Sequence, residues 1–199
     1  MSNKKITISI IIAAVLLIIG VIGWYFYAKQ NTQNQLEKLK VNYPELTAQI
    51  DDVIKWEEKL KEDETRVESY TTLGLVWKSL ADKACDLKIE NCLDYYGEAL
   101  KVYEKGVEAT MRKNTLFLTN AGNMVRYLKN YAKTEDYYRE AISVAPGDAS
   151  LYLSLVELYE YDMKKSKEEI TAVFDEGIKR LVNPAILEKN KESYLERSK

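Results

Sequence analysis

The chain has 199 residues, enough for a membrane segment and one modest domain but too few for two large domains. Charged residues make up 30% of it and nearly cancel to a net charge of -2, whereas nucleic-acid binding needs a concentrated basic surface. Glycine (8) and proline (3) are too scarce for the turns of an all-β fold, and the absence of histidine removes the commonest general base and metal ligand. The composition therefore predicts an all-α protein that does not bind nucleic acid.

The first predicted element is a membrane anchor that follows a short tail, residues 1–5. The run Ile6–Ala28 contains no charged side chain. As a helix it would be about 34 Å long, and the hydrocarbon core of a bilayer is about 30 Å thick. Rings suited to the headgroup region gather at its end, at Trp24, Tyr25 and Tyr27. The sequence therefore predicts a transmembrane helix over residues 6–28, in contact with the lipid bilayer.

A cleaved signal peptide is the alternative for this run. Signal peptides have an apolar core of about 7 to 15 residues and end at a small-x-small site, whereas bulky rings occupy that end here. A buried core helix is disfavoured because the run has no polar face. Lys4 and Lys5 precede the run and Lys29 follows it, so the positive-inside count is close to a tie. A short tail before a large domain is typical of a signal anchor. We therefore expect a single-pass cell-membrane protein with a cytoplasmic N-terminus and an extracytoplasmic domain.

Residues 29–44 are polar and predict a juxtamembrane linker, with helix only around Leu36 and Leu39. Pro44 suits the first turn of a helix. Apolar residues then follow at helical spacing, at Leu46, Ile50, Val53, Ile54 and Leu60. This spacing predicts a helix from Glu45 to Glu62, which would close one end of the domain.

A five-residue pattern then recurs: aromatic, two polar residues, small residue, β-branched residue. It occupies Tyr103–Val107, Tyr138–Ile142 and Phe174–Ile178, with the aromatic residues 35 and then 36 positions apart. Each copy follows a second small motif, Leu73-Gly74 with Trp77, Ala121-Gly122 with Val125, and Leu155-Val156 with Tyr159. A small residue lets two helices approach closely while a ring fills the space beside it. The pattern predicts helix pairs that bury their apolar faces against their neighbours.

These motifs resemble the tetratricopeptide repeat (TPR) family. The second unit, Thr115–Asp148, has the family's period of 34 residues and matches it at Gly122, Tyr138, Ala141 and Pro146. The first unit has 13 extra residues between its helices and matches at Leu73, Gly74, Trp77, Ala99, Tyr103 and Gly106. The third has two extra residues in its turn and matches at Tyr152, Leu155, Tyr159, Phe174 and Gly177. It departs at Val156, where the family prefers a small residue, so looser packing is expected there.

The resemblance covers Val67 to Pro184 and implies an α-solenoid of about three helix hairpins. We place the repeat domain at residues 45–184. Residues 185–199 have few apolar positions and predict a final capping helix, as a solenoid end requires.

Cys85 and Cys92, the only cysteines, lie in the insertion of the first unit. In one continuous helix they would be about 10.5 Å apart, too far for a disulfide. If the insertion lengthens both helices instead, the turn falls at Asp86 to Asn91 and the cysteines face each other. An extracytoplasmic location would favour their oxidation, so we predict a disulfide, with two free thiols as the alternative.

In TPR proteins the first helix of each unit lines a concave groove. Carried onto this chain, the candidate groove residues are Thr71, Lys78, Thr119, Asn120, Asn123, Arg126, Tyr127, Leu153, Glu157, Glu160 and Tyr161. Some TPR domains hold a terminal carboxylate with asparagine and lysine, but Thr119 stands where that lysine is expected and the third unit is acidic. A mixed polar groove for a helix or an extended segment is favoured. For each residue, an ordinary solvated helix face is the alternative.

No catalytic pattern was found. There is no glycine-rich phosphate loop and no nucleophile that could pair with a histidine, and adjacent acids such as Asp51-Asp52 point in different directions on a helix. We therefore expect no enzyme activity, cofactor, metal or small-molecule substrate. The leading hypothesis is a membrane-anchored scaffold or adaptor that binds a protein partner in a cell-envelope complex. The alternatives are a chaperone-like protein that holds clients near a translocation or secretion channel, and a self-associating structural module.

Overall fold

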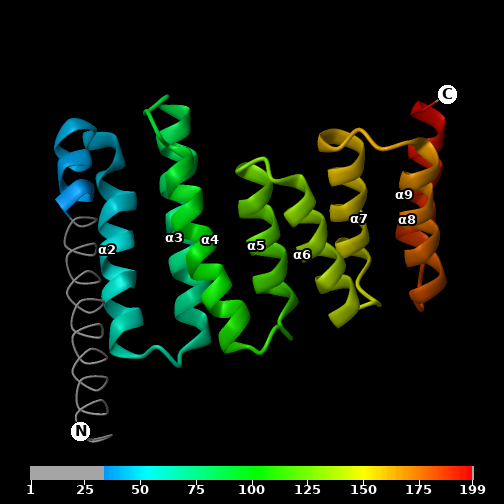
Figure 1. The fold of residues 1–199 in the computed structure, drawn as a ribbon, viewed down its shortest axis with the longest axis horizontal. Helices are drawn as coiled ribbons and strands as arrows, with labels where there is room; N and C mark the ends of the chain where they lie inside the picture. The colour runs from blue at the N-terminus through cyan, green and yellow to red at the C-terminus, as the bar shows by residue number, and fades with distance from the viewer. Residues whose placement is uncertain (1–33, 199) are drawn as a thin grey trace, which may run out of the picture. The chain divides into compact units, whose positions relative to one another are not determined.

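The computed structural model describes residues 34–198, and every regular element within them is helical (Figure 1). The chain divides into two compact units, Met1–Ile54 and Lys55–Lys199. The predicted tail at residues 1–5 and the predicted anchor at residues 6–28 lie outside the described residues. Within residues 34–198, no helix is both long and apolar enough to cross a membrane.

In the first unit, part of the segment predicted as a polar linker is helical. Residues 34–42 form a helix, as the leucine spacing suggested, and Leu36 on it is buried. The 3-10 helix η1 (Pro44–Leu46) then leads into α2 (Thr47–Glu62). Pro44 lies in the first turn of η1, so it begins a helical segment as predicted. The ammonium of Lys40 donates a hydrogen bond to Oδ1 of Asp51 at 2.5 Å, which ties the two helical segments together.

The second unit is a row of antiparallel helices in which each helix packs against the next (Figure 1). Its elements are α3 (Val67–Asp86), α4 (Leu93–Ala109), α5 (Thr115–Tyr127), α6 (Tyr131–Val144), α7 (Ala149–Glu157), the π-helix η2 (Leu158–Asp162), α8 (Lys167–Arg180) and α9 (Ala185–Arg197). The pairs α3–α4, α5–α6 and α7–α8 are the three hairpins that the repeat predicted. The final helix α9 buries only Leu187 and Tyr194, which suits a capping helix.

Glycines mark the places where helices come closest. A Cβ added at Gly74 would lie 2.5 Å from the ring of Tyr103, and one added at Gly106 would lie 2.5 Å from the ring of Phe117. At Gly122 the same atom would meet the ring of Tyr138 at 2.7 Å. Real side chains do not tolerate such distances, so only glycine lets these helices pack this closely. The predicted pairing of small residues with rings is confirmed at Gly74 and Gly122.

Helix ends use other residues than glycine. Lys88, Met111 and Lys129 have left-handed backbone conformations just after α3, α4 and α5. Beyond Lys129, the amide of Asn130 donates to the carbonyl of Val125 at 3.1 Å, which is the long bond of a Schellman motif. No described glycine has a positive φ. Among the described glycines, Gly74, Gly106, Gly122 and Gly177 therefore lie where helices pack closely, whereas Gly147 lies in the turn between α6 and α7.

The insertion in the first unit lengthens both helices of its hairpin. Helices α3 and α4 have 20 and 17 residues, whereas α5 and α6 have 13 and 14. The α3–α4 hairpin therefore projects beyond the next one, as expected if the insertion extends both helices.

In the third hairpin, the extra residues were predicted to lie in the turn. The structure places part of this extra length in the π-helix at Leu158–Asp162, where the amide of Met163 donates to the carbonyl of Leu158 at 2.9 Å. A π turn holds more residues than an α turn, so it takes up added length within the helix. Val156 itself is buried, so the looser packing expected at this position stays a prediction.

Two buried tyrosines in equivalent positions differ in their hydroxyl groups. The hydroxyl of Tyr103 is buried without a hydrogen-bond partner among the described residues, and burial raises its pKa to about 12. The hydroxyl of Tyr138 donates to Oδ1 of Asn123 at 2.5 Å.

We therefore expect Tyr103→Phe to leave the free energy of unfolding unchanged or to raise it by about 1 kcal/mol, because an unsatisfied buried hydroxyl is costly. Tyr138→Phe should lower it by about 0.5 to 1.5 kcal/mol, because a made hydrogen bond is lost. Urea unfolding of both variants measures the difference. Equal effects, or a larger loss at Tyr103, would contradict this assignment.

Candidate functional site

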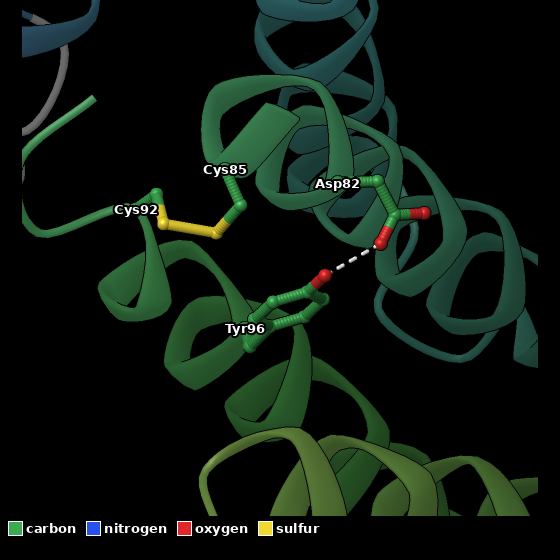
Figure 2. Close-up of a disulfide and its surroundings, with 4 residues drawn as sticks. All are labelled: Asp82, Cys85, Cys92 and Tyr96. Carbon is green, nitrogen blue, oxygen red and sulfur yellow. Dashed lines mark hydrogen bonds between the residues drawn. A yellow bond between two sulfur atoms is a disulfide. The ribbon is translucent and has the colours of Figure 1, made fainter. Parts of the chain in front are cut away.

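A disulfide joins the two helices at the tip of the long hairpin. Cys85 at the end of α3 and Cys92 just before α4 are bonded, with an S–S distance of 2.09 Å and Cα atoms 5.1 Å apart. The turn between them covers residues 87–92, close to the predicted turn. One turn below the sulfurs, the hydroxyl of Tyr96 donates to Oδ1 of Asp82 at 2.7 Å (Figure 2). The disulfide and this hydrogen bond together hold α3 against α4.

Tyr96 connects this tip to α5. Its ring stacks on that of Tyr127, with centroids 4.5 Å apart and planes 9° apart. The ammonium of Lys78 bonds Oδ2 of Asp82 at 2.6 Å and lies 5.3 Å from the centre of the Tyr127 ring. Burial first, and then the hydrogen bond to Asp82, raise the pKa of Tyr96. Two predicted groove residues from different hairpins, Lys78 and Tyr127, are thus brought together.

Arg126 connects α5 to the third hairpin. Its guanidinium bonds Oδ2 of Asp162 at 2.6 Å and lies 3.6 Å from Oε2 of Glu157. Burial alone would lower the pKa of Arg126, but the hydrogen bond and charge of Asp162 outweigh burial and raise it. The structure therefore brings Arg126 and Glu157 together and adds Asp162, which the sequence did not single out.

Other candidate residues have different surroundings. Glu160 is bonded to the guanidinium of Arg197 on α9, with its Oε2 at 2.7 Å, so it faces the capping helix. Tyr161 is exposed. Among the remaining candidates, the side chains of Thr71, Thr119 and Asn120 are half-buried and make no hydrogen bond or ion pair within residues 34–198. These three carry no sign of a structural role.

Two exposed leucines were missed from the sequence. Leu75 lies one turn after Thr71 on α3, and Leu116 lies one turn before Thr119 and Asn120 on α5. About half of each is exposed, 49% for Leu75 and 50% for Leu116. Helical spacing places each leucine in the same row as the polar candidates. That spacing could have identified them, but leucine on an amphipathic helix is normally assigned to the core.

We call the surface formed by these rows the first-helix face. It comprises Glu68, Thr71, Leu75 and Lys78 on α3; Leu116, Thr119, Asn120, Asn123, Arg126 and Tyr127 on α5; and Leu153, Glu157, Glu160 and Tyr161 on α7 and η2. Its rows are joined by the contact of Lys78 with Tyr127 and that of Arg126 with Glu157. It combines polar side chains with exposed apolar ones.

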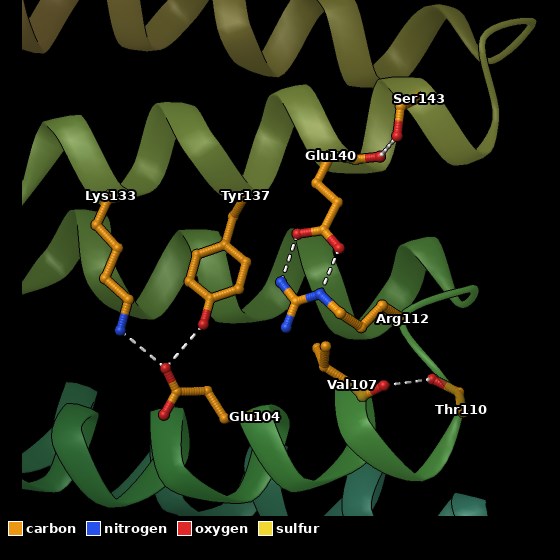
Figure 3. A network of polar contacts seen from close by, with 8 residues as sticks. All are labelled: Glu104, Val107, Thr110, Arg112, Lys133, Tyr137, Glu140 and Ser143. Atoms are coloured by element: carbon orange, nitrogen blue, oxygen red, sulfur yellow. Dashed lines mark hydrogen bonds and ion pairs between the residues drawn. The ribbon is translucent and has the colours of Figure 1, made fainter.

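The second helices of the hairpins are connected by a different polar network (Figure 3). Oε1 of Glu104 on α4 accepts hydrogen bonds from Lys133 at 2.9 Å and from Tyr137 at 2.7 Å, both on α6. Burial tends to raise the pKa of Glu104, but these two bonds outweigh it and lower the pKa. Arg112 forms a two-pronged ion pair with Glu140 in the same network. These contacts hold the first repeat against the second and involve few apolar groups.

Within residues 34–198, no group of three or more acidic or cysteine side chains could hold a metal ion. No protein-family model and no curated protein matches the sequence. Solved structures do match. The crystal structure of TTC0263, a thermophilic TPR protein of Thermus thermophilus, covers 82% of this chain and 81% of its own, at 16% identity and a TM-score of 0.59.

The chain has a TPR-like fold. A crystal structure of the MamA protein matches as well, over 77% of this chain and 75% of its own, at 18% identity and a TM-score of 0.51. At such identities the likeness establishes the fold of the TPR-like repeats. What they bind has to be argued from the side chains of this chain.

Proposed function

We propose that this chain is a membrane-anchored scaffold that binds a protein partner through the first-helix face. The observation that carries the proposal is the half-exposure of Leu75, Leu116 and Tyr127 on two consecutive first helices. Protein-binding surfaces are enriched in aromatic side chains and gather apolar groups into a patch with polar residues around it. The polar groups of the second helices, in contrast, form contacts between neighbouring repeats.

The fixed and partly exposed ring of Tyr127 supports a role in binding a partner. One side of its ring is covered by Tyr96, and 43% of the residue remains exposed. Because Tyr96 is itself held by Asp82, the ring of Tyr127 is fixed before any partner arrives. A rigid aromatic residue loses little conformational entropy on binding, which favours affinity.

Photo-cross-linking of the full chain in its own membranes tests this proposal. A benzophenone amino acid would replace Leu116 on the first-helix face or, as control, exposed Lys105 on α4. We expect one discrete cross-linked protein from the Leu116 position and none from Lys105. A product of twice the chain's mass would indicate self-association, and a ladder of many products would indicate client holding. Absence of any product, or equal products from both positions, would contradict the proposal.

The membrane location is proposed from the uncharged run Ile6–Ala28, and the extracytoplasmic side from the disulfide between the two cysteines. A structural disulfide persists in oxidising compartments and is rare in the cytosol. We propose that the scaffold serves a cell-envelope complex on that side. Protease added to intact cells should digest the repeats, and repeats that survive until the cells are lysed would exclude this orientation.

A further inference from the structure

The charges of the first-helix face differ in how far the chain has already neutralised them. Both cations are paired with acids: Lys78 lies 2.6 Å from Asp82, and Arg126 lies 2.6 Å from Asp162. The acid Glu160 is likewise paired, with Arg197. The positive charges of this face are therefore committed to the chain's own carboxylates.

Two carboxylates remain open. Glu157 keeps 59% of its side chain exposed, and its one ion pair is a 3.6 Å contact with Arg126, which bonds Asp162 more closely. Glu68, seven residues before Leu75 on the same side of α3, is exposed and has no ion pair within residues 34–198. The uncompensated charge of the face is thus negative, and it lies on the first and third hairpins.

Apolar groups lie on the helices that carry these acids and on the helix between them. Leu75 follows Glu68 by two turns on α3, Leu116 and Tyr127 lie on α5, and Tyr161, which is 55% exposed, follows Glu157 by one turn. A segment that crosses the three helices would meet a carboxylate and an apolar side chain on the first and third hairpins, and Leu116 and Tyr127 on α5. Lysine and arginine match such a surface, because their aliphatic stems pack on apolar groups while their heads reach acids.

From this arrangement we infer that the first-helix face binds a basic amphipathic segment of a partner protein, one that carries lysine or arginine among large apolar side chains. The inference rests on the proposed function and adds the chemistry of the partner. The leucines and Tyr127 supply most of the affinity, because apolar burial is the larger contribution. Glu68 and Glu157 select the sign of the partner's charge and speed its association.

The test uses the full chain in nanodiscs of phosphatidylcholine, a lipid without net charge, with empty nanodiscs as background. The probes are a short fluorescent helix-forming peptide of leucine and lysine and its counterpart with glutamate in place of lysine. Fluorescence anisotropy should show at least tenfold tighter binding of the lysine peptide, and added salt should weaken that binding. Equal binding of the two peptides, or tighter binding of the glutamate peptide, would overturn the inference.

Variants locate the binding. Glu157→Lys should weaken the binding of the lysine peptide by about two- to fivefold, as expected when an exposed ion pair is made repulsive. Glu108→Lys on α4 makes the same charge change away from the first-helix face and should leave the binding of this peptide unchanged. Leu116→Ser should weaken it by tenfold or more. A lysine peptide that is insensitive to both Glu157→Lys and Leu116→Ser binds elsewhere, which would also overturn the inference.

The two proposals fail separately. Discrete cross-linking at Leu116 together with no preference for the lysine peptide would support the scaffold proposal and contradict the inference of a basic partner. Loss of the cross-link as well would remove both.

Discussion

Gly106→Ala is expected to lower the free energy of unfolding by about 1 to 3 kcal/mol, because the new methyl group would enter a filled space. The added Cβ would lie 2.5 Å from two ring atoms of Phe117, which is fully buried and cannot swing aside. Alanine is the better helix former by about 1 kcal/mol, so the steric cost must exceed that gain. The loss should appear as a lower urea midpoint, with the α4–α5 junction exchanging its amide hydrogens faster.

Gly97→Ala provides the matched control, because Gly97 lies in the same helix and a Cβ there would meet nothing within 4 Å. Here only the helix propensity changes, and we expect a gain of up to about 1 kcal/mol. Opposite signs for one substitution in one helix would identify close packing as the reason for glycine at position 106. If both variants were stabilised, the contact between Gly106 and Phe117 would be looser than described.

Replacing both Cys85 and Cys92 by serine is expected to lower the free energy of unfolding by about 2 to 3 kcal/mol. The bond closes a short loop, with a sequence separation of 7, and for so short a loop the chain-entropy model gives about 2.4 kcal/mol. Both positions are partly exposed, so serine adds little cost of its own. Faster hydrogen exchange should be confined to the ends of α3 and α4 that the bond joins.

A reducing agent removes the disulfide without changing any residue, so it distinguishes the effect of the bond from the effect of the serine substitutions. It should destabilise the unmodified chain by the same amount and leave the double serine variant unchanged. An unmodified chain that is indifferent to the reducing agent would mean that the two helices are held at this tip by Asp82 and Tyr96 alone.

The repeat architecture was predictable because it depends on contacts that recur in sequence. Glycine or alanine at a fixed distance from a ring specifies a helix pair wherever it occurs, and Gly74 with Tyr103 and Gly122 with Tyr138 form such pairs in the structure. For the first hairpin the sequence left two possibilities open, two free thiols or a disulfide that requires both helices to be lengthened, and the structure shows the disulfide. These features are set by spacing along the chain, which can be read directly.

The partners of the face residues could not be read in this way. Asp162 lies in a π-helix and contacts Arg126. No periodic pattern in the sequence predicts the π turn that directs Asp162 toward Arg126. Tyr96 was assigned no role because its function depends on stacking against a residue 31 positions later, on another hairpin. Such pairings follow from the rotation of each helix about its axis, which small shifts in packing decide.

The π-helix at Leu158–Asp162 separates the length of the third repeat from the chemistry of its surface. Loss of one residue there would yield ordinary α-helix, so the fold could accept the deletion. Because the π turn takes up one extra residue within a single turn, the side chains beyond the deletion would keep nearly the same direction around the helix axis. A deletion within an α-helical stretch would instead turn the following side chains by about 100°. A change of one residue in length at η2 could thus be accepted during evolution while Asp162 stays against Arg126.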